Sequence, residues 1–239
     1  MKISKVMNNF LYLFFPKRCA CCDEIIYPFE TLCKSCKPEN CRIPYPKCPK
    51  CSQEKDRCDC KDGNFKFDNL LSAFYYKDEI SRSVRLFKFN VYTDNGKYLA
   101  ENMSNLLMTD YYYKEIDMII SVAMTRRRKN FRGFSQTDYL AKIISNKTGI
   151  PFNKNVLIKT RETMPQVGLK AKDRKENLHG AFKTNRKYDL KGKTVLLVDD
   201  IKTTGATLNE CTKMLKKAGA KKVVCLTAAI TKEELKGEA

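Results

Sequence analysis

Residues 194–217 limit the possible folds of this chain more than any other segment. An apolar run at 195–198 is followed by two carboxylates and a turn rich in hydroxyl groups and glycine. This pattern predicts a buried strand at 194–198 and a helix at 207–217 closed by Gly219. Such a turn offers backbone N–H groups and the positive end of a helix dipole to a phosphate. We therefore expect a phosphorylated sugar as ligand, with its hydroxyls on the two carboxylates and its phosphate on the turn.

Strand-like and helical segments alternate over the rest of residues 70–229. The predicted strands are 70–76, 118–122, 155–158, 194–198 and 222–229, and the helices between them are 78–89, 95–108, 135–145 and 207–217. Ser135 is a suitable N-cap for the third of these helices. Alternation of this kind predicts an α/β fold with a mostly parallel sheet flanked by helices. Ligands of such sheets bind beyond the carboxyl ends of the strands, where the turn after residue 202 lies.

Ten of the twelve cysteines lie within residues 19–60. Closely spaced cysteine pairs are typical of tetrahedral zinc sites, and reduced cysteines of a cytoplasmic protein favour metal over disulfides. Four pairs provide ligands for two structural Zn²⁺ ions. Successive ribbons would use Cys19, Cys22, Cys33 and Cys36, then Cys48, Cys51, Cys58 and Cys60. A cross-braced pairing and a redox role for one pair remain open, and Cys21 and Cys41 are left over.

Changes in composition and apolar periodicity divide the chain into three parts. Residues 1–15 predict a short amphipathic helix, and its apolar run at 10–15 is too short to span a bilayer. Residues 16–62 lack the apolar periodicity of a core, and bound zinc can supply roughly 10–16 kcal/mol toward folding. Residues 63–239 form the α/β domain. We expect a cytoplasmic protein without stable membrane insertion.

The charge of the chain is strongly positive and unevenly distributed. The formal net charge is +19, and residues 121–190 hold 17 lysines and arginines against 5 acids. A segment of this kind attracts polyanions such as nucleic acid or pyrophosphate. Basic and aromatic residues also alternate in the cysteine-rich segment, a composition that suits a single nucleic-acid strand. A solubilising surface explains the same composition equally well.

The segment 195–207 resembles the phosphoribosyl pyrophosphate loop of type I phosphoribosyltransferases. By that resemblance Asp199 and Asp200 hold the ribose 2′- and 3′-hydroxyls. The residues that it assigns to the 5′-phosphate are Thr203, Thr204, Gly205, Ala206 and Thr207. Residues 121–128 follow a predicted strand at the place where that family binds pyrophosphate. The residues that the resemblance assigns to pyrophosphate are Thr125, Arg126, Arg127 and Arg132. Mg²⁺ bridging the pyrophosphate and the ribose is then expected.

Further segments extend the resemblance over essentially the whole chain. They are 132–136, 163–166 and 174–182, in this order and behind an N-terminal cysteine module. Together they resemble the ComF family, which joins zinc ribbons to a phosphoribosyltransferase-like domain. The resemblance implies a role in DNA uptake during natural transformation, with single-stranded DNA and proteins of the DNA-uptake machinery as partners. Those partners would bring the protein to the inner membrane as a peripheral component.

The resemblance leaves the chemistry open. Purine-salvage relatives place an Asp base where this chain has Thr203, and orotate-type relatives use mobile-loop lysines on the departing pyrophosphate. Residues that would act similarly here are Lys170, Lys172, Arg174 and Lys175. His179 fits a structural hydrogen bond better than a general base. Three functions remain: a DNA-handling protein that binds phosphoribosyl pyrophosphate or a nucleotide, an active phosphoribosyltransferase, and a sensor of phosphoribosyl pyrophosphate without catalysis.

Overall fold

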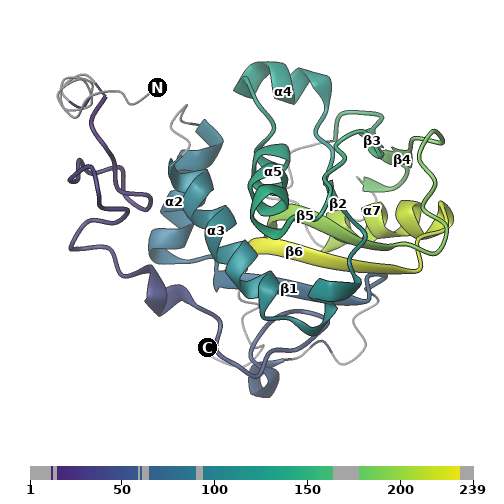
Figure 1. The fold of residues 1–239 in the computed structure, drawn as a ribbon, viewed down its shortest axis with the longest axis horizontal. Helices are drawn as coiled ribbons and strands as arrows, with labels where there is room; N and C mark the ends of the chain where they lie inside the picture. The colour runs from purple at the N-terminus through teal and green to yellow at the C-terminus, as the bar shows by residue number, and fades with distance from the viewer. Residues whose placement is uncertain are drawn as a thin grey trace.

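The computed structural model describes residues 12, 15–58, 60, 65–89, 94–163 and 178–231. Its centre is a parallel sheet with strand order β1-β6-β5-β2 (Figure 1). The strands are β1 (Asn69–Tyr75), β2 (Met118–Ser121), β5 (Thr194–Lys202) and β6 (Lys222–Ile230). The helices that flank it are α2 (Asp78–Phe89), α3 (Asp94–Met108), α5 (Gln136–Thr148) and α7 (Ala206–Lys217). This confirms the predicted α/β fold class. The predicted helix at 1–15 lies outside the described residues, except for positions 12 and 15.

The apolar residues of the central strands divide between two cores. On β5, Leu196 and Val198 pack in the core formed with α2, α3 and α5. Val195 and Leu197 pack in the core beneath α7. Successive side chains of a strand point to opposite faces, so a continuous apolar run is what a strand covered on both faces requires. The carboxyl end of β5 is thereby fixed between two packed layers.

Two small elements stand above this carboxyl end. Helix α4 (Arg126–Arg132) follows β2, and β3 (Leu157–Lys159) pairs antiparallel with β4 (Phe182–Thr184). The predicted strand at 155–158 therefore belongs to this hairpin and not to the main sheet. The sequence analysis missed α4 because none of its residues is buried, so it carries no apolar periodicity. It missed β4 because three residues are too few to show a pattern.

The cysteine-rich segment covers the open edge of β1. The amide of Leu70 donates to the carbonyl of Pro49 at 2.8 Å, and the amide of Ser72 donates to Ser52 Oγ at 2.9 Å. The carbonyl of Ser72 accepts from Lys47 Nζ at 3.0 Å. These bonds satisfy edge groups that would otherwise be available for pairing with another chain. The segment also contains the 3-10 turns η1 (Pro38–Cys41) and η2 (Lys55–Arg57).

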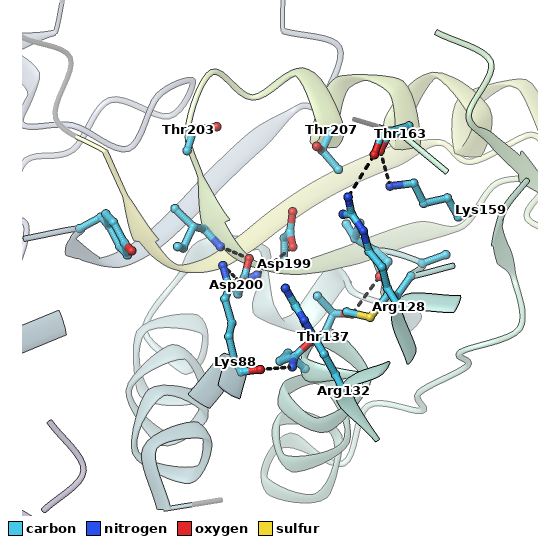
Figure 2. Close-up of a pocket in the computed structure, with 16 residues that line it drawn as sticks. Lys88, Arg128, Arg132, Thr137, Lys159, Thr163, Asp199, Asp200, Thr203 and Thr207 are labelled. Atoms are coloured by element: carbon cyan, nitrogen blue, oxygen red, sulfur yellow. Dashed lines mark hydrogen bonds and ion pairs between the residues drawn. The ribbon is translucent and has the colours of Figure 1, made fainter. Parts of the chain in front are cut away.

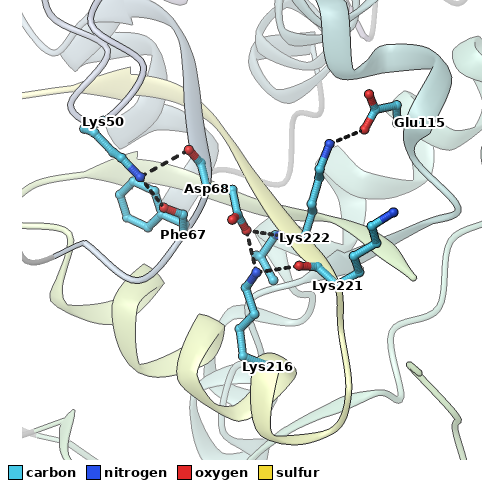
Figure 3. Close-up of polar contacts among 8 residues, drawn as sticks. Lys50, Phe67, Asp68, Glu115, Lys216, Lys221 and Lys222 are labelled. Atoms are coloured by element: carbon cyan, nitrogen blue, oxygen red, sulfur yellow. Dashed lines mark hydrogen bonds and ion pairs between the residues drawn. The ribbon is translucent and has the colours of Figure 1, made fainter. Parts of the chain in front are cut away.

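Polar contacts continue this attachment along the start of β1 (Figure 3). Lys50 Nζ donates to the carbonyls of Phe67 and Asp68 at 3.2 and 3.4 Å. The Asp68 carboxylate in turn accepts from the amide of Val223 and forms an ion pair with Lys216 at 2.8 Å. The cysteine-rich segment, the sheet and α7 are thus joined by a continuous set of contacts. Among the described residues, no helix is long and apolar enough to cross a membrane.

Candidate functional site

The acid pair lies at the end of β5, where its neighbour β2 has already stopped. The last register pair between them is Ser121 with Val198, whereas β6 stays paired with β5 as far as Lys202. Asp199 and Asp200 are therefore strand residues, and the strand is longer than the predicted 194–198. Because β2 leaves the sheet before these acids, one side of β5 opens into a crevice. This is the position where parallel sheets bind ligands.

The two acids have opposite electrostatic environments. Burial, followed by the neighbouring Asp200, raises the pKa of Asp199 well above its usual value. Burial alone would raise the pKa of Asp200 as well, but the ammonium of Lys88 at 2.8 Å holds it below its usual value. Burial alone would lower the pKa of Lys88, but the attraction of its ammonium to Asp200 raises the pKa above its usual value. The site therefore contains one stable carboxylate beside an acid that readily holds a proton.

The turn after the acids needs a glycine. Gly205 has a φ of 78° and is the N-cap of α7. A Cβ at this position would lie 2.8 Å from Cε1 of Phe65. Positive φ is accessible to glycine without strain, and here a larger residue would also have to displace the ring. The turn thus carries the chain from the buried strand into α7 and places Thr203 and Thr207 at the pocket.

The acid pair, Thr203 and Thr207 line a cavity of about 480 Å³ (Figure 2). Cations surround the acid pair: Lys88 from α2, Arg128 and Arg132 from α4, and Lys159 from β3. Arg128 donates to the carbonyl of Thr163 at 3.0 Å, and Lys159 donates to the Thr163 hydroxyl at 3.0 Å. These contacts hold two cations on the side of the cavity away from Lys88 (Figure 2). One cavity therefore contains carboxylates, which suit sugar hydroxyls, together with ammonium and guanidinium groups, which suit phosphates.

The structure places the predicted phosphate and pyrophosphate residues in different surroundings. The acids, Thr203, Thr207 and Arg132 line this cavity, and Thr204, Gly205 and Ala206 form the turn and the start of α7. Thr125, Arg126 and Arg127 line a neighbouring groove instead. Thr125 caps α4 by accepting from the amide of Arg128 at 3.4 Å. The candidate catalytic residues Lys170, Lys172, Arg174 and Lys175 lie outside the described residues.

Sequence reasoning missed three cations of the cavity: Lys88, Arg128 and Lys159. Lys88 is a single cation within the otherwise apolar end of an amphipathic helix, which is a weak signal. Arg128 could have been identified only by recognising α4 as a helix, because residues 128 and 132 then share one face. Ser135 was correctly predicted as a cap: its hydroxyl accepts from the amide of Asp138 at 3.3 Å.

The cysteines form two compact clusters. The first contains Cys19, Cys22, Cys33 and Cys36, the second Cys48, Cys51, Cys58 and Cys60, and within each the sulfurs lie within 4.8 Å of one another. Four thiolates on one Zn²⁺ with bonds of about 2.3 Å would place sulfurs about 3.8 Å apart. The clusters fit two successive zinc ribbons and exclude the cross-braced alternative.

Backbone amides support ionised sulfur in both clusters. The amide of Cys33 donates to Cys19 Sγ at 3.3 Å, and that of Lys50 donates to Cys48 Sγ at 3.4 Å. Burial raises the pKa of Cys48, but such amides bring it down to about 7. Burial and the neighbouring sulfurs raise the pKa of Cys51 to about 12. Four thiolates this close need a bound cation for joint ionisation, and a zinc ion would supply it.

The two remaining cysteines of this segment are buried outside the clusters. Burial and then the charge of Cys19 raise the pKa of Cys21 to about 12. The Cys41 thiol donates to the carbonyl of Lys77 at 3.7 Å and to Glu79 at 3.6 Å. Neither residue belongs to a set of four sulfurs, and Cys41 instead lies beside the carboxylates of Asp78 and Glu79.

A parallel sheet with an acid pair, a glycine turn and a helix at its carboxyl end defines a phosphoribosyltransferase-type domain. A family model, the phosphoribosyl transferase domain, matches residues 136–238. The solved purine phosphoribosyltransferase from Pyrococcus horikoshii is similar over 57% of this chain and 84% of its own, with 21% identity and a TM-score of 0.36.

Curated relatives match both parts of the chain. Competence protein F of Haemophilus influenzae is 30% identical over 88% of this chain and 95% of its own length. The DNA utilization protein YhgH of Escherichia coli K12 is 27% identical over 84% of this chain and 85% of its own. Competence protein ComFC of Bacillus subtilis is 24% identical over 82% of each. The chain belongs to the ComF family of competence proteins.

Proposed function

We propose that this protein binds phosphoribosyl pyrophosphate, or a related phosphorylated ribose, and handles single-stranded DNA during natural transformation. The observation that carries the proposal is the acid pair at the end of β5, next to the Gly205 turn and surrounded by four cations. The names of the relatives, competence protein and DNA utilization protein, support the biological role.

The chemistry of the cavity supports a phosphoribosyl ligand. Asp200, kept ionised by Lys88, would accept from a ribose hydroxyl, and a protonated Asp199 could donate to the other. The start of α7 would take the 5′-phosphate. Arg128, Arg132 and Lys159 would bind the pyrophosphate. The carboxylate oxygens also suit Mg²⁺, which would neutralise pyrophosphate charge when bound.

Calorimetric titration with phosphoribosyl pyrophosphate and Mg²⁺ tests this proposal. The double variant Asp199→Asn, Asp200→Asn should lose binding, because amides cannot replace the charge that pairs with Lys88. Asp189→Asn, an exposed acid away from the cavity, is the matched control and should bind like the wild type. Equal affinity of the double variant and the control would contradict the proposal.

Phosphoribosyl transfer is the alternative function, and the cations opposite Lys88 favour it. Arg128 and Lys159 lie where they could stabilise the charge that develops on a departing pyrophosphate. In that reaction an acceptor nitrogen bonds to C1 of the ribose while the C1–oxygen bond to pyrophosphate breaks. Pyrophosphate release with a panel of purine, pyrimidine and amine acceptors tests it. Tight binding without release from any acceptor would leave a binding protein or a sensor.

A further inference from the structure

A second cavity, of about 880 Å³, adjoins the phosphoribosyl pocket. It lies between α4 and the β3–β4 hairpin, which rise on the same side of the sheet (Figure 1). The two cavities share Ala123, Met124 and Lys159 in their linings and are therefore neighbours. We call this second cavity the basic groove.

The groove is lined by far more cations than acids. Its basic residues are Arg126, Arg127, Lys129, Lys154, Lys159, Arg161, Lys183 and Lys187. Its acids are Asp138 and Glu162. Asp138 already accepts from Ser121 Oγ at 2.6 Å and lies 3.9 Å from Lys129. Glu162 lies 3.6 Å from Arg128. The acids thus neutralise only a small part of the charge that the groove presents.

Helix α4, one wall of the groove, is attached by polar contacts and not through the core. None of its residues is buried, and Phe131 is 84% exposed. A short helix without an apolar face gains nothing from the core. Cations of neighbouring elements also repel each other: burial and then the nearby Arg128 of α4 lower the pKa of Lys159 in β3. An anion that lies along the groove would relieve this repulsion.

We propose that the basic groove binds the phosphate backbone of a single nucleic-acid strand. This inference rests on the proposed function and places the strand beside the phosphoribosyl pocket instead of on the zinc ribbons. The cations come from α4, from β3 and the segments on either side of it, from β4 and from the segment after β4, so they match phosphates spaced along a chain. A compact pyrophosphate needs only the cations of the smaller cavity. Tyr188 also lines the groove, and such a ring can stack on a base.

Fluorescence anisotropy with a labelled oligothymidylate longer than about 16 nucleotides tests the groove. The groove variant carries Lys154, Lys183 and Lys187 replaced by Gln. The matched control carries Lys34, Lys37 and Lys55 of the cysteine-rich segment replaced by Gln. All six lysines are exposed, so both variants lose the same charge. Binding of phosphoribosyl pyrophosphate, followed by thermal shift, reports whether each variant is folded.

The groove variant should lose affinity for DNA by about tenfold or more at low salt. Its log–log salt slope should fall by about 2, since each phosphate contact contributes about 0.7. The control should keep most of its affinity and slope. An equal or larger loss of DNA affinity in the control variant would overturn the inference. Inorganic polyphosphate that displaces the labelled DNA as well as unlabelled DNA does, at the same phosphate concentration, would also overturn it. Absence of DNA binding by the wild type would instead refute the DNA-handling part of the proposed function.

Discussion

Replacement of Lys88 by Met removes the lysine that pairs with Asp200 and keeps roughly the length of the side chain. The Lys88 and Asp200 side chains are 24% and 16% exposed and 2.8 Å apart. Loss of one partner from a fully buried pair costs about 3–5 kcal/mol. Because this pair retains some contact with water, a charge-assisted hydrogen bond of about 1.5–3 kcal/mol is the better measure. We therefore expect Lys88→Met to lower the free energy of unfolding at pH 8 by that amount.

The pH dependence follows from the directions of the pKa shifts. The folded pKa of Asp200 is lowered, so its contribution is complete above its unfolded value of about 3.9 and is lost as pH falls through the folded value. The folded pKa of Lys88 is raised, so its contribution is complete below its unfolded value of about 10.4 and is lost as pH rises through the folded value. The pair therefore contributes fully between pH 6 and pH 8.

In Lys88→Met, the two adjacent buried acids lose this cation, and both should hold protons more tightly when folded than when unfolded. The variant should then lose stability relative to the wild type between pH 6 and pH 8. Urea denaturation at both pH values, with zinc held constant, measures the difference. Lys77→Met is the control, because Lys77 and Asp78 form an exposed pair at 3.8 Å whose loss should have little effect. A Lys88→Met variant as stable as the wild type at pH 8 would refute the reasoning.

Three further predictions test other parts of the structure. Gly205→Ala should lower the free energy of unfolding by about 1–3 kcal/mol in thermal denaturation. The loss should be larger than for the control Gly149→Ala, because Gly149 also has a positive φ, of 76°, but a Cβ there would meet nothing within 4 Å. Equal losses in the two variants would argue against the Phe65 contact. Arg128→Gln should weaken pyrophosphate binding in calorimetry more than Arg126→Gln, because only Arg128 lines the smaller cavity. Removal of zinc by a chelator should speed hydrogen exchange at the β1 amides of Leu70 and Ser72, because these amides donate to the cysteine-rich segment. Exchange at Ile119 of β2 should stay unchanged. Exchange at Leu70 and Ser72 that is equally slow with and without the chelator would contradict this attachment.

The parts of the site that the sequence predicts are those with local causes. The apolar run before Asp199 requires a strand covered on both faces, and the spacing of the cysteines predicts two sets of four ligands, of which the structure has the successive arrangement. Ser135 caps α5 through its own hydroxyl, so the boundary of that helix is also a local property. None of these predictions needs a contact between distant segments.

The parts that sequence reasoning missed depend on tertiary contacts. Lys88 and Asp200 are separated by more than a hundred residues in the sequence, and no local pattern around Lys88 predicts a carboxylate partner. The strand that carries the acids continues to Lys202 because β6 remains paired with it as far as Ile230. The four consecutive basic residues 126–129 look alike in the sequence. Only the helical turn of α4 separates Arg128, in the pocket, from Arg126 and Arg127, in the groove.

The contacts of the cysteine-rich segment give it a part in the geometry of the pocket. Ala20 lies between zinc ligands, and its carbonyl accepts from Ser83 Oγ of α2 at 2.7 Å and from Asn95 Nδ2 of α3 at 2.8 Å, all buried. Ser83 and Lys88 lie on the same helix, so the first cysteine cluster fixes the middle of the element whose last turn brings Lys88 to Asp200. The second cluster fixes the outer edge of β1 in the same sheet as the acids. Because both clusters contact elements of the α/β domain directly, zinc bound there would stabilise the sheet and the helix that together position the acid pair and Lys88.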